Sequence, residues 1–202
     1  MGKIKSVCVY CGSNPGTAPE FRRAAADLGA ALARAGIRLV YGGSNCGLMG
    51  AVSRACLDNG GNVLGVITEQ LYRLVENPEL TETRVVPGMA ARKQMFFDES
   101  DAFVALPGGF GTAEELLEAL AWQTLGLNRK PVALFNAAGF FAPLLDWMDA
   151  MCKAGFVRRE QREQVIVATE PAELLAKLEA YEYSYVCKWD RRPDAPDSCG
   201  NR

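Results

Sequence analysis

Four charged residues in the middle of the chain are the strongest candidates for chemistry: Arg92 and Lys93, and Glu114 and Glu115. The glutamates follow the glycine-rich residues 107–112 and belong to the first turn of an expected helix. A carboxylate there can stabilise a developing positive charge or take a proton from water, and a basic pair can hold a phosphate. Acidic residues also favour a helix N-terminus without any catalytic role, and a basic pair can be a solvated helix face. Position alone therefore leaves both interpretations open.

Three glycine-bearing loops are expected to meet at one edge of the fold. Gly12 and Ser13 follow the first apolar segment, Gly42 and Gly43 follow the second, and residues 107–112 follow the fifth. Ligands of an open parallel sheet bind beyond the carboxyl ends of the strands, and glycine lets the backbone approach them closely. Unpaired N–H groups at the start of a following helix favour an anion. Three such loops together favour a phosphate-bearing ligand, although each alone is equally explained by turn geometry.

Short apolar segments alternate with longer helical patterns, and these elements must position the loops. The expected strands are residues 4–10, 37–41, 63–67, 83–86, 102–106, 131–135 and 165–168. The expected helices are residues 17–36, 48–59, 89–100, 112–125, 140–154 and 171–181, with a short helix and a loop within 69–80. Thr17 and Glu20 predict a capping box at the first helix. This pattern predicts a single doubly wound, Rossmann-like α/β domain, a mostly parallel sheet with helices on both faces.

The domain is expected to span residues 1–181. The alternating pattern stops after Tyr181, and the remaining residues, 182–202, end in a polar stretch with two prolines. Such a composition predicts a flexible C-terminal tail.

The composition excludes several classes of function. The 202 residues carry a net charge of −2, so nothing marks the surface for nucleic acid or an anionic membrane, and no apolar run is long enough for a membrane span. The chain has no histidine, which removes Ser-His and Cys-His catalysis and histidine metal ligands. Acid–base chemistry must then come from carboxylates, tyrosine, lysine or cysteine.

The seven cysteines are interpreted as reduced thiols of a cytoplasmic protein, because their number is odd and no signal peptide opens the chain. Cys8 and Cys11 form a CxxC pattern within an expected strand. Residues three apart on a strand face opposite sides, so core positions are favoured over a redox pair.

Two phosphate-binding motifs are only partly present. Gly42 and Gly47 have the spacing of a P-loop, but Leu48 and Met49 stand where its lysine and hydroxyl residue belong. The stretch beginning at Gly109 starts like a dinucleotide fingerprint, but Glu114 occupies its third glycine position and would repel a pyrophosphate. A nucleoside triphosphatase and an NAD-binding enzyme are both disfavoured.

Residues 107–115, PGGFGTAEE, resemble the PGGxGTxxE signature of the Lonely Guy family, and residues 89–93, MAARK, resemble its M-x-x-R-K segment. Further similar segments are residues 11–13, 41–43, 47–50, 100–106, 122–126 and 155–156. These proteins are cytokinin riboside 5′-monophosphate phosphoribohydrolases, often mislabelled lysine decarboxylases. The resemblance extends over about residues 4–180 and departs at Phe110, where tyrosine is common, and in the tail.

The resemblance implies a hydrolase that cleaves the N-glycosidic bond of a nucleoside 5′-monophosphate, AMP or a cytokinin nucleotide, to free base and ribose 5-phosphate. It assigns catalysis to Arg92 and Glu115. It assigns substrate binding, mostly of the phosphate, to Gly108, Gly109, Gly111 and Thr112. The other expected substrate contacts are Gly12, Ser13, Gly42, Gly43, Met89, Lys93 and Glu114. No metal or cofactor is required, and the family usually forms dimers, which implies a homodimer.

In the expected mechanism, a carboxylate stabilises an oxocarbenium-like sugar and activates the attacking water. Glu115 fills that role, and its place near a helix N-terminus is expected to keep it ionised at neutral pH. Arg92 is an electrostatic partner, because arginine stays protonated.

Two other functions stay open. A nucleotide or cofactor carrier on the same fold would bind tightly without turnover. A lysine decarboxylase would need pyridoxal phosphate on a lysine and a partner for its pyridine nitrogen, and nothing in the sequence marks such a set. The sequence does not name the preferred base.

Overall fold

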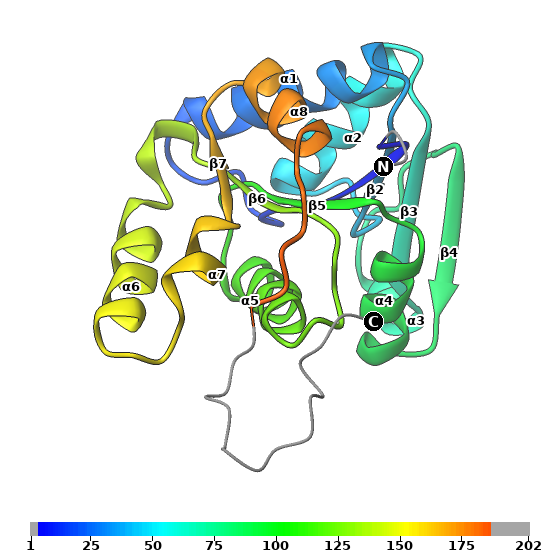
Figure 1. Cartoon of the computed structure of the whole chain (residues 1–202). Helices are drawn as coiled ribbons and strands as arrows, with labels where there is room; N and C mark the ends of the chain where they lie inside the picture. Colours follow the sequence, from blue (N-terminus) through cyan, green and yellow to red (C-terminus); the bar gives the residue numbers. More distant parts are fainter. Residues whose placement is uncertain (1–3, 187–202) are drawn as a thin grey trace.

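A seven-stranded parallel sheet forms the centre of the structure, a computed structural model in which residues 4–186 are described (Figure 1). The strands are β1 (Ser6–Tyr10), β2 (Arg38–Tyr41), β3 (Val63–Thr68), β4 (Glu82–Val86), β5 (Ala102–Ala105), β6 (Val132–Phe135) and β7 (Ile166–Ala168). The helices are α1 (Pro19–Arg34), α2 (Gly47–Asp58), α3 (Glu69–Leu74), α4 (Met89–Asp98), α5 (Phe110–Thr124), α6 (Ala142–Lys153), α7 (Arg159–Glu163) and α8 (Pro171–Glu179), with a 3₁₀ turn η1 (Ala137–Gly139). The predicted Rossmann-like α/β fold is confirmed.

Helices cover both faces of this sheet. One face packs against α1, α2 and α8, and the other against α4, α5 and α6 (Figure 1). The central strands are buried on both sides, which explains why they read as continuous apolar runs rather than as alternating patterns. Cys8 and Cys11 lie in the two opposite cores, both as free buried thiols, so their predicted core positions are confirmed.

The strand order is β4-β3-β2-β1-β5-β6-β7. The chain builds outward from β1 to β4 and then returns through α4 to place β5 on the other side of β1. The loops after β1 and β5 therefore diverge at the topological switch point, where ligands of this fold class bind. Gly12 N donates to Pro107 O at 3.0 Å and ties these two loops together.

The structure differs from the sequence expectations at two helices. α1 begins at Pro19 with Ala18 as its N-cap, and no side chain caps it, so the predicted capping box at Thr17 and Glu20 is wrong. Proline is well suited to the first helical turn and sets the start two residues later. The short helix α7 was not expected, because its sequence, REQRE, has no apolar period.

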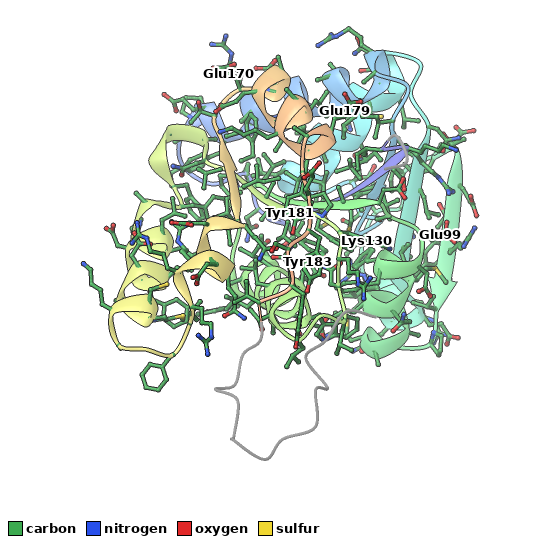
Figure 2. All side chains as sticks on the ribbon, viewed as in Figure 1. Glu99, Lys130, Glu170, Glu179, Tyr181 and Tyr183 are labelled. Carbon is green, nitrogen blue, oxygen red and sulfur yellow. The ribbon has the colours of Figure 1, made fainter. Side chains whose placement is uncertain are left out.

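Residues 181–186 run from α8 along α5, and Figure 2 shows Tyr181 and Tyr183 on this path. The Tyr183 hydroxyl donates to Gln123 O at 3.2 Å, and Gln164 Nε2 donates to Ser184 O at 2.8 Å. This part of the predicted tail is thus hydrogen-bonded to the domain, and its remainder, residues 187–202, lies outside the described residues. Within residues 4–186, no helix has the length and apolarity needed to cross a membrane.

Candidate active site

A cavity of about 650 Å³ opens at the carboxyl edge of the sheet. The loops after β1, β2 and β5 line it together with parts of α2, α3, α4 and α5. Among the described residues that line it, only Arg92 and Glu115 carry a charge. The two residues predicted to be catalytic therefore lie in one cavity, together with the first turn of α5.

The Arg92 guanidinium is fixed by the ends of two strands. Its Nε donates to Val66 O at 2.9 Å and its Nη2 to Gly42 O at 3.1 Å. The ring of Phe96 lies beneath it, 5.1 Å from Cζ. Its Nη1 lies 3.5 Å from Glu115 Oε1, and the two side chains are 9% and 12% exposed. Two hydrogen bonds to the backbone thus hold the guanidinium in place, and its Nη1 faces Glu115 in the cavity.

The Arg92 guanidinium occupies the space where a side chain at position 42 would lie. A Cβ at Gly42 would lie 2.6 Å from Arg92 Nη2 and 2.6 Å from Met49 Sδ, so any larger residue would displace the guanidinium. Gly43 has a φ of +81°, and its Cβ would press on Ile67. Of the two, Gly42 lines the cavity and Gly43 does not; the positive φ gives Gly43 a reason of its own to be glycine.

Burial raises the pKa of Glu115 to about 7, while Arg92 opposes the shift. The expectation that the helix N-terminus keeps this carboxylate ionised at neutral pH is therefore wrong. Glu115 lies in the second turn of α5, beyond the strongest part of the helix dipole, and desolvation disfavours its charged form. A carboxyl group with such a pKa is suited to acid–base catalysis near pH 7.

The start of α5 has backbone amides without helical acceptors, an arrangement that favours an anion. Ala113 N makes the first intrahelical hydrogen bond, to Gly109 O at 3.0 Å, so the preceding amides at 110–112 have no acceptor within the helix. A Cβ at Gly109 or Gly111 would meet no atom within 4 Å. The fold therefore does not need glycine at these two positions, and their bare backbone leaves the approach to the amides open.

Gly12, Gly108 and Thr112 interlock beneath this turn. A Cβ at Gly108 would lie 2.1 Å from Thr112 Oγ1 and 2.9 Å from Gly12 N. Gly12 O also accepts from Leu48 N at 3.0 Å, which fixes the start of α2. All three residues line the cavity, but this packing gives Gly12 and Gly108 a structural reason to be glycine as well. Ser13 lines the cavity mouth and is exposed.

Three further predicted contact residues do not line the cavity: Met89, Lys93 and Glu114. The Met89 sulfur lies 3.9 Å from Arg92 Nη1, beside the site rather than in it. Lys93 forms ion pairs with Glu114 and with Glu118, the second at 3.0 Å. The basic and acidic pairs thus divide: Arg92 and Glu115 meet inside the cavity, and Lys93 and Glu114 meet outside it.

The cavity has an apolar part that the sequence interpretation did not include. Its lining residues are Ile67 of β3, Leu71 of α3 and Val75, the residue that caps the end of α3. Thr68 Oγ1 accepts from Leu71 N at 3.3 Å and caps this short helix. The sequence of α3 carries only a weak period, so the signal that could have been used was the threonine cap. In residues 4–186 no three Cys, Asp or Glu side chains gather in a way that could hold a metal ion.

Gly111→Ala tests the anion site. The methyl group has room and replaces glycine in a helix, so we expect the free energy of unfolding to stay level or rise by up to about 1 kcal/mol. The same methyl would stand over the free amides, so the KM for a phosphate-bearing substrate should rise about tenfold, the change for some 1.4 kcal/mol of lost binding. Denaturant unfolding and steady-state kinetics measure the two effects.

Gly88→Ala is the matched control for this variant. A Cβ at Gly88 also meets open space, but the residue caps α4 and does not line the cavity. If Gly111→Ala shows the predicted stability but an unchanged KM, the substrate anion does not bind at this turn.

Comparison with known proteins shows which family this chain resembles. A family model described as possible lysine decarboxylase matches residues 49–178. The rice (Oryza sativa subsp. japonica) cytokinin riboside 5′-monophosphate phosphoribohydrolase LOG is 44% identical over 191 residues, which cover 93% of this chain and 79% of that protein. The Arabidopsis thaliana cytokinin riboside 5′-monophosphate phosphoribohydrolase LOG3 is 43% identical over 180 residues, 89% of this chain and 84% of that protein.

Solved structures share the fold at lower identity. The molybdenum cofactor carrier protein of Chlamydomonas reinhardtii has a TM-score of 0.63 at 23% identity, covering 87% of this chain and 95% of its own. That likeness shows the fold alone. The structural-genomics protein TM1055 has a TM-score of 0.65 at 27% identity, covering 87% of this chain and 98% of its own.

Proposed function

Because this chain belongs to the Lonely Guy family of cytokinin riboside 5′-monophosphate phosphoribohydrolases, we propose that it hydrolyses the N-glycosidic bond of a nucleoside 5′-monophosphate. The products are a free base and ribose 5-phosphate. One observation carries the proposal for this chain: Arg92 and Glu115, both largely buried and 3.5 Å apart, share a cavity with the free amides that begin α5.

The phosphate would lie on the amides of residues 110–112, and the ribose would then extend toward Glu115 one turn further along α5. A separation of one helical turn between the phosphate site and Glu115 suits a nucleotide, because the phosphate and the anomeric carbon lie at opposite ends of one sugar. Binding energy from the phosphate thereby places the scissile bond beside the carboxylate.

Cleavage breaks the bond between C1′ and the base nitrogen, and its electron pair leaves with the base. Positive charge develops on the sugar, where the Glu115 carboxylate stabilises it. Glu115 then accepts a proton from the water whose oxygen bonds to C1′. A pKa near 7 lets it hold that proton and pass it on to the departing base anion, so the base leaves neutral and the carboxylate is restored. Arg92 stabilises negative charge on the departing base through the positive charge of its guanidinium, which does not give up protons at this pH.

The base would lie toward the ends of β2 and β3, beyond Arg92. Ile67, Leu71 and Val75 line this end, and an apolar substituent on the base would bury its surface there. The geometry therefore supports a cytokinin nucleotide at least as well as AMP.

The test is a panel of nucleoside monophosphates incubated with the purified protein, with free bases separated by chromatography. We expect adenine from AMP and a higher kcat/KM for the N6-isopentenyl nucleotide. Tight AMP binding without any free base would instead show a carrier. A pyridoxal-type aldimine absorbance would favour a decarboxylase, but no lysine of the described chain lines the cavity.

Turnover should rise with pH through an apparent pKa near 7, because the carboxylate form of Glu115 is required and burial raises its pKa to about 7. We expect this rise in kcat at saturating substrate, between pH 5 and pH 9. Since the folded pKa lies above the unfolded one, Glu115 favours folding most below about pH 4.5, and this contribution is lost as pH rises through 7.

Unfolding measurements separate Glu115 from the substrate, whose phosphate loses its second proton near pH 6. Relative to Glu115→Gln, the native protein should lose stability between pH 5 and pH 8. A stability difference that does not change over this interval would show that the Glu115 pKa is not raised.

We also propose a homodimer in the cytoplasm. Leu125 and Leu127, at 39% and 71% exposure, leave apolar surface uncovered at the end of α5, and a second copy of the chain would cover it. The five described cysteines are free thiols, as a reducing compartment favours. Size-exclusion chromatography with light scattering should give a mass twice that of the chain, and a monomer at micromolar concentration would contradict the dimer.

A further inference from the structure

We propose that Lys93 is a positioning residue, whose ion pairs with Glu114 and Glu118 hold α4 against α5 so that Arg92 and Glu115 face each other. The inference rests on the proposed function, because it assigns Lys93 a role in that reaction. It also differs from phosphate binding, the role that the sequence suggested for this lysine.

The two helices place three pairs of side chains in register. Arg92 meets Glu115, Lys93 meets Glu118 at 3.0 Å, and Phe97 packs on Trp122 with ring centroids 4.3 Å apart. Later residues of α4 meet later residues of α5, so the helices run side by side in the same direction. The aromatic contact joins their C-terminal halves, and neither of its rings lines the cavity.

Lys93 is the link nearest to the catalytic pair. It follows Arg92 directly in α4, and its two partners flank Glu115 in α5 at one residue before and three residues after. Its side chain is 20% exposed and that of Glu118 is 23% exposed, so water screens this pair less than a fully exposed one. Glu114 is 52% exposed and contributes less.

The charges around Lys93 argue against a substrate contact. Two carboxylates already surround its ammonium group, and hydrogen bonds with them raise its pKa. The lysine does not line the cavity. A phosphate brought to this ammonium would have to approach both carboxylates, and like charges at that distance repel.

Loss of the clamp should affect the chemical step more than binding. The phosphate site belongs to α5 alone, whereas the Arg92–Glu115 geometry needs α4 and α5 together. A misplacement of about 1 Å can cost up to about 10²-fold in rate. We therefore expect Lys93→Met to lower kcat about tenfold and to change the KM for AMP less than threefold.

Three variants separate a clamp from a phosphate ligand. A clamp predicts that Glu114→Gln combined with Glu118→Gln lowers kcat like Lys93→Met, and that the exchanged pair Lys93→Glu with Glu118→Lys recovers most of the loss. A phosphate ligand predicts a large rise in KM for Lys93→Met, unchanged or tighter AMP binding in the double glutamine variant, and no recovery by exchange. The second set of results overturns the proposal.

Lys177→Met is the matched control, because Lys177 pairs with Glu173 at 2.6 Å on the remote helix α8. The kcat of this variant should match that of the native protein.

If the native protein releases no base from any nucleotide, the proposed function fails, and two measurements still decide about Lys93. A clamp requires unchanged AMP affinity in Lys93→Met by calorimetry and a favourable Lys93–Glu118 coupling in a double-mutant unfolding cycle. Weakened AMP binding or zero coupling would overturn it.

Discussion

Replacing Glu115 by glutamine is expected to lower base release about 10³-fold, within the range for loss of a general base. Glutamine keeps the size of the side chain but can neither neutralise a cationic sugar nor accept a proton from water. The free energy of unfolding should not fall at pH 8, because the variant removes a carboxylate that burial disfavours. Initial rates with AMP and denaturant unfolding measure the two effects.

Glu163→Gln is the control for this substitution. Glu163 lies on α7, 61% exposed and paired with Arg159, and its loss should leave the rate unchanged. A Glu115→Gln protein with near-native turnover would show that another group performs the chemistry.

Replacing Arg92 by alanine is expected to reduce base release by a similar factor, about 10³-fold, and also to destabilise the fold. The variant removes the one cationic side chain among the described cavity residues. It also leaves the carbonyls of Val66 and Gly42 without their donor, which costs about 1–3 kcal/mol. Arg92 lowers the Glu115 pKa, so the pH limb of the residual activity should move upward.

Arg92→Lys distinguishes charge from geometry. Lysine keeps the charge but cannot bond to both carbonyls and face Glu115 at once. Arg92→Lys should therefore be more stable than Arg92→Ala but should have less than a tenth of the native rate. Full activity in Arg92→Lys would show that only the charge matters, and full activity in Arg92→Ala would remove this residue from the mechanism.

The sequence was sufficient to predict the fold and the location of the cavity. Continuous apolar strands indicated a sheet covered on both faces, and parallel strands bring the loops after β1, β2 and β5 to one edge. These features follow from local periodicity and from topology. The sequence placed Glu115 in the first turn of the helix after the glycine-rich loop, whereas the structure has it in the second turn, because α5 already begins at Phe110.

The environment of each side chain was harder to predict. Lys93 was expected to bind phosphate as part of a basic pair, and Glu114 was expected to contact the substrate as part of an acidic pair. Successive residues of a helix point about 100° apart, so one of each pair faces the cavity and the other does not. Which one does depends on how α4 packs against α5, and that depends on side chains far apart in the chain.

The prediction that Glu115 stays ionised at neutral pH was wrong for a similar reason. A sequence shows distance from a helix start, which predicts a lowered pKa, but it does not show burial. In the structure Glu115 is 12% exposed, and desolvation outweighs the opposing effect of Arg92. Gly42 was likewise assigned to the ligand, whereas its lack of a side chain also makes room for Arg92.

The most direct measurement is a crystal structure of Glu115→Gln with bound AMP, because the slow variant should retain the intact nucleotide. We expect the phosphate oxygens on the amides of residues 110–112 and C1′ within about 3.5 Å of the Gln side chain introduced at position 115. A nucleotide bound with its phosphate away from the start of α5, or with C1′ on the far side of the cavity from that side chain, would contradict the account.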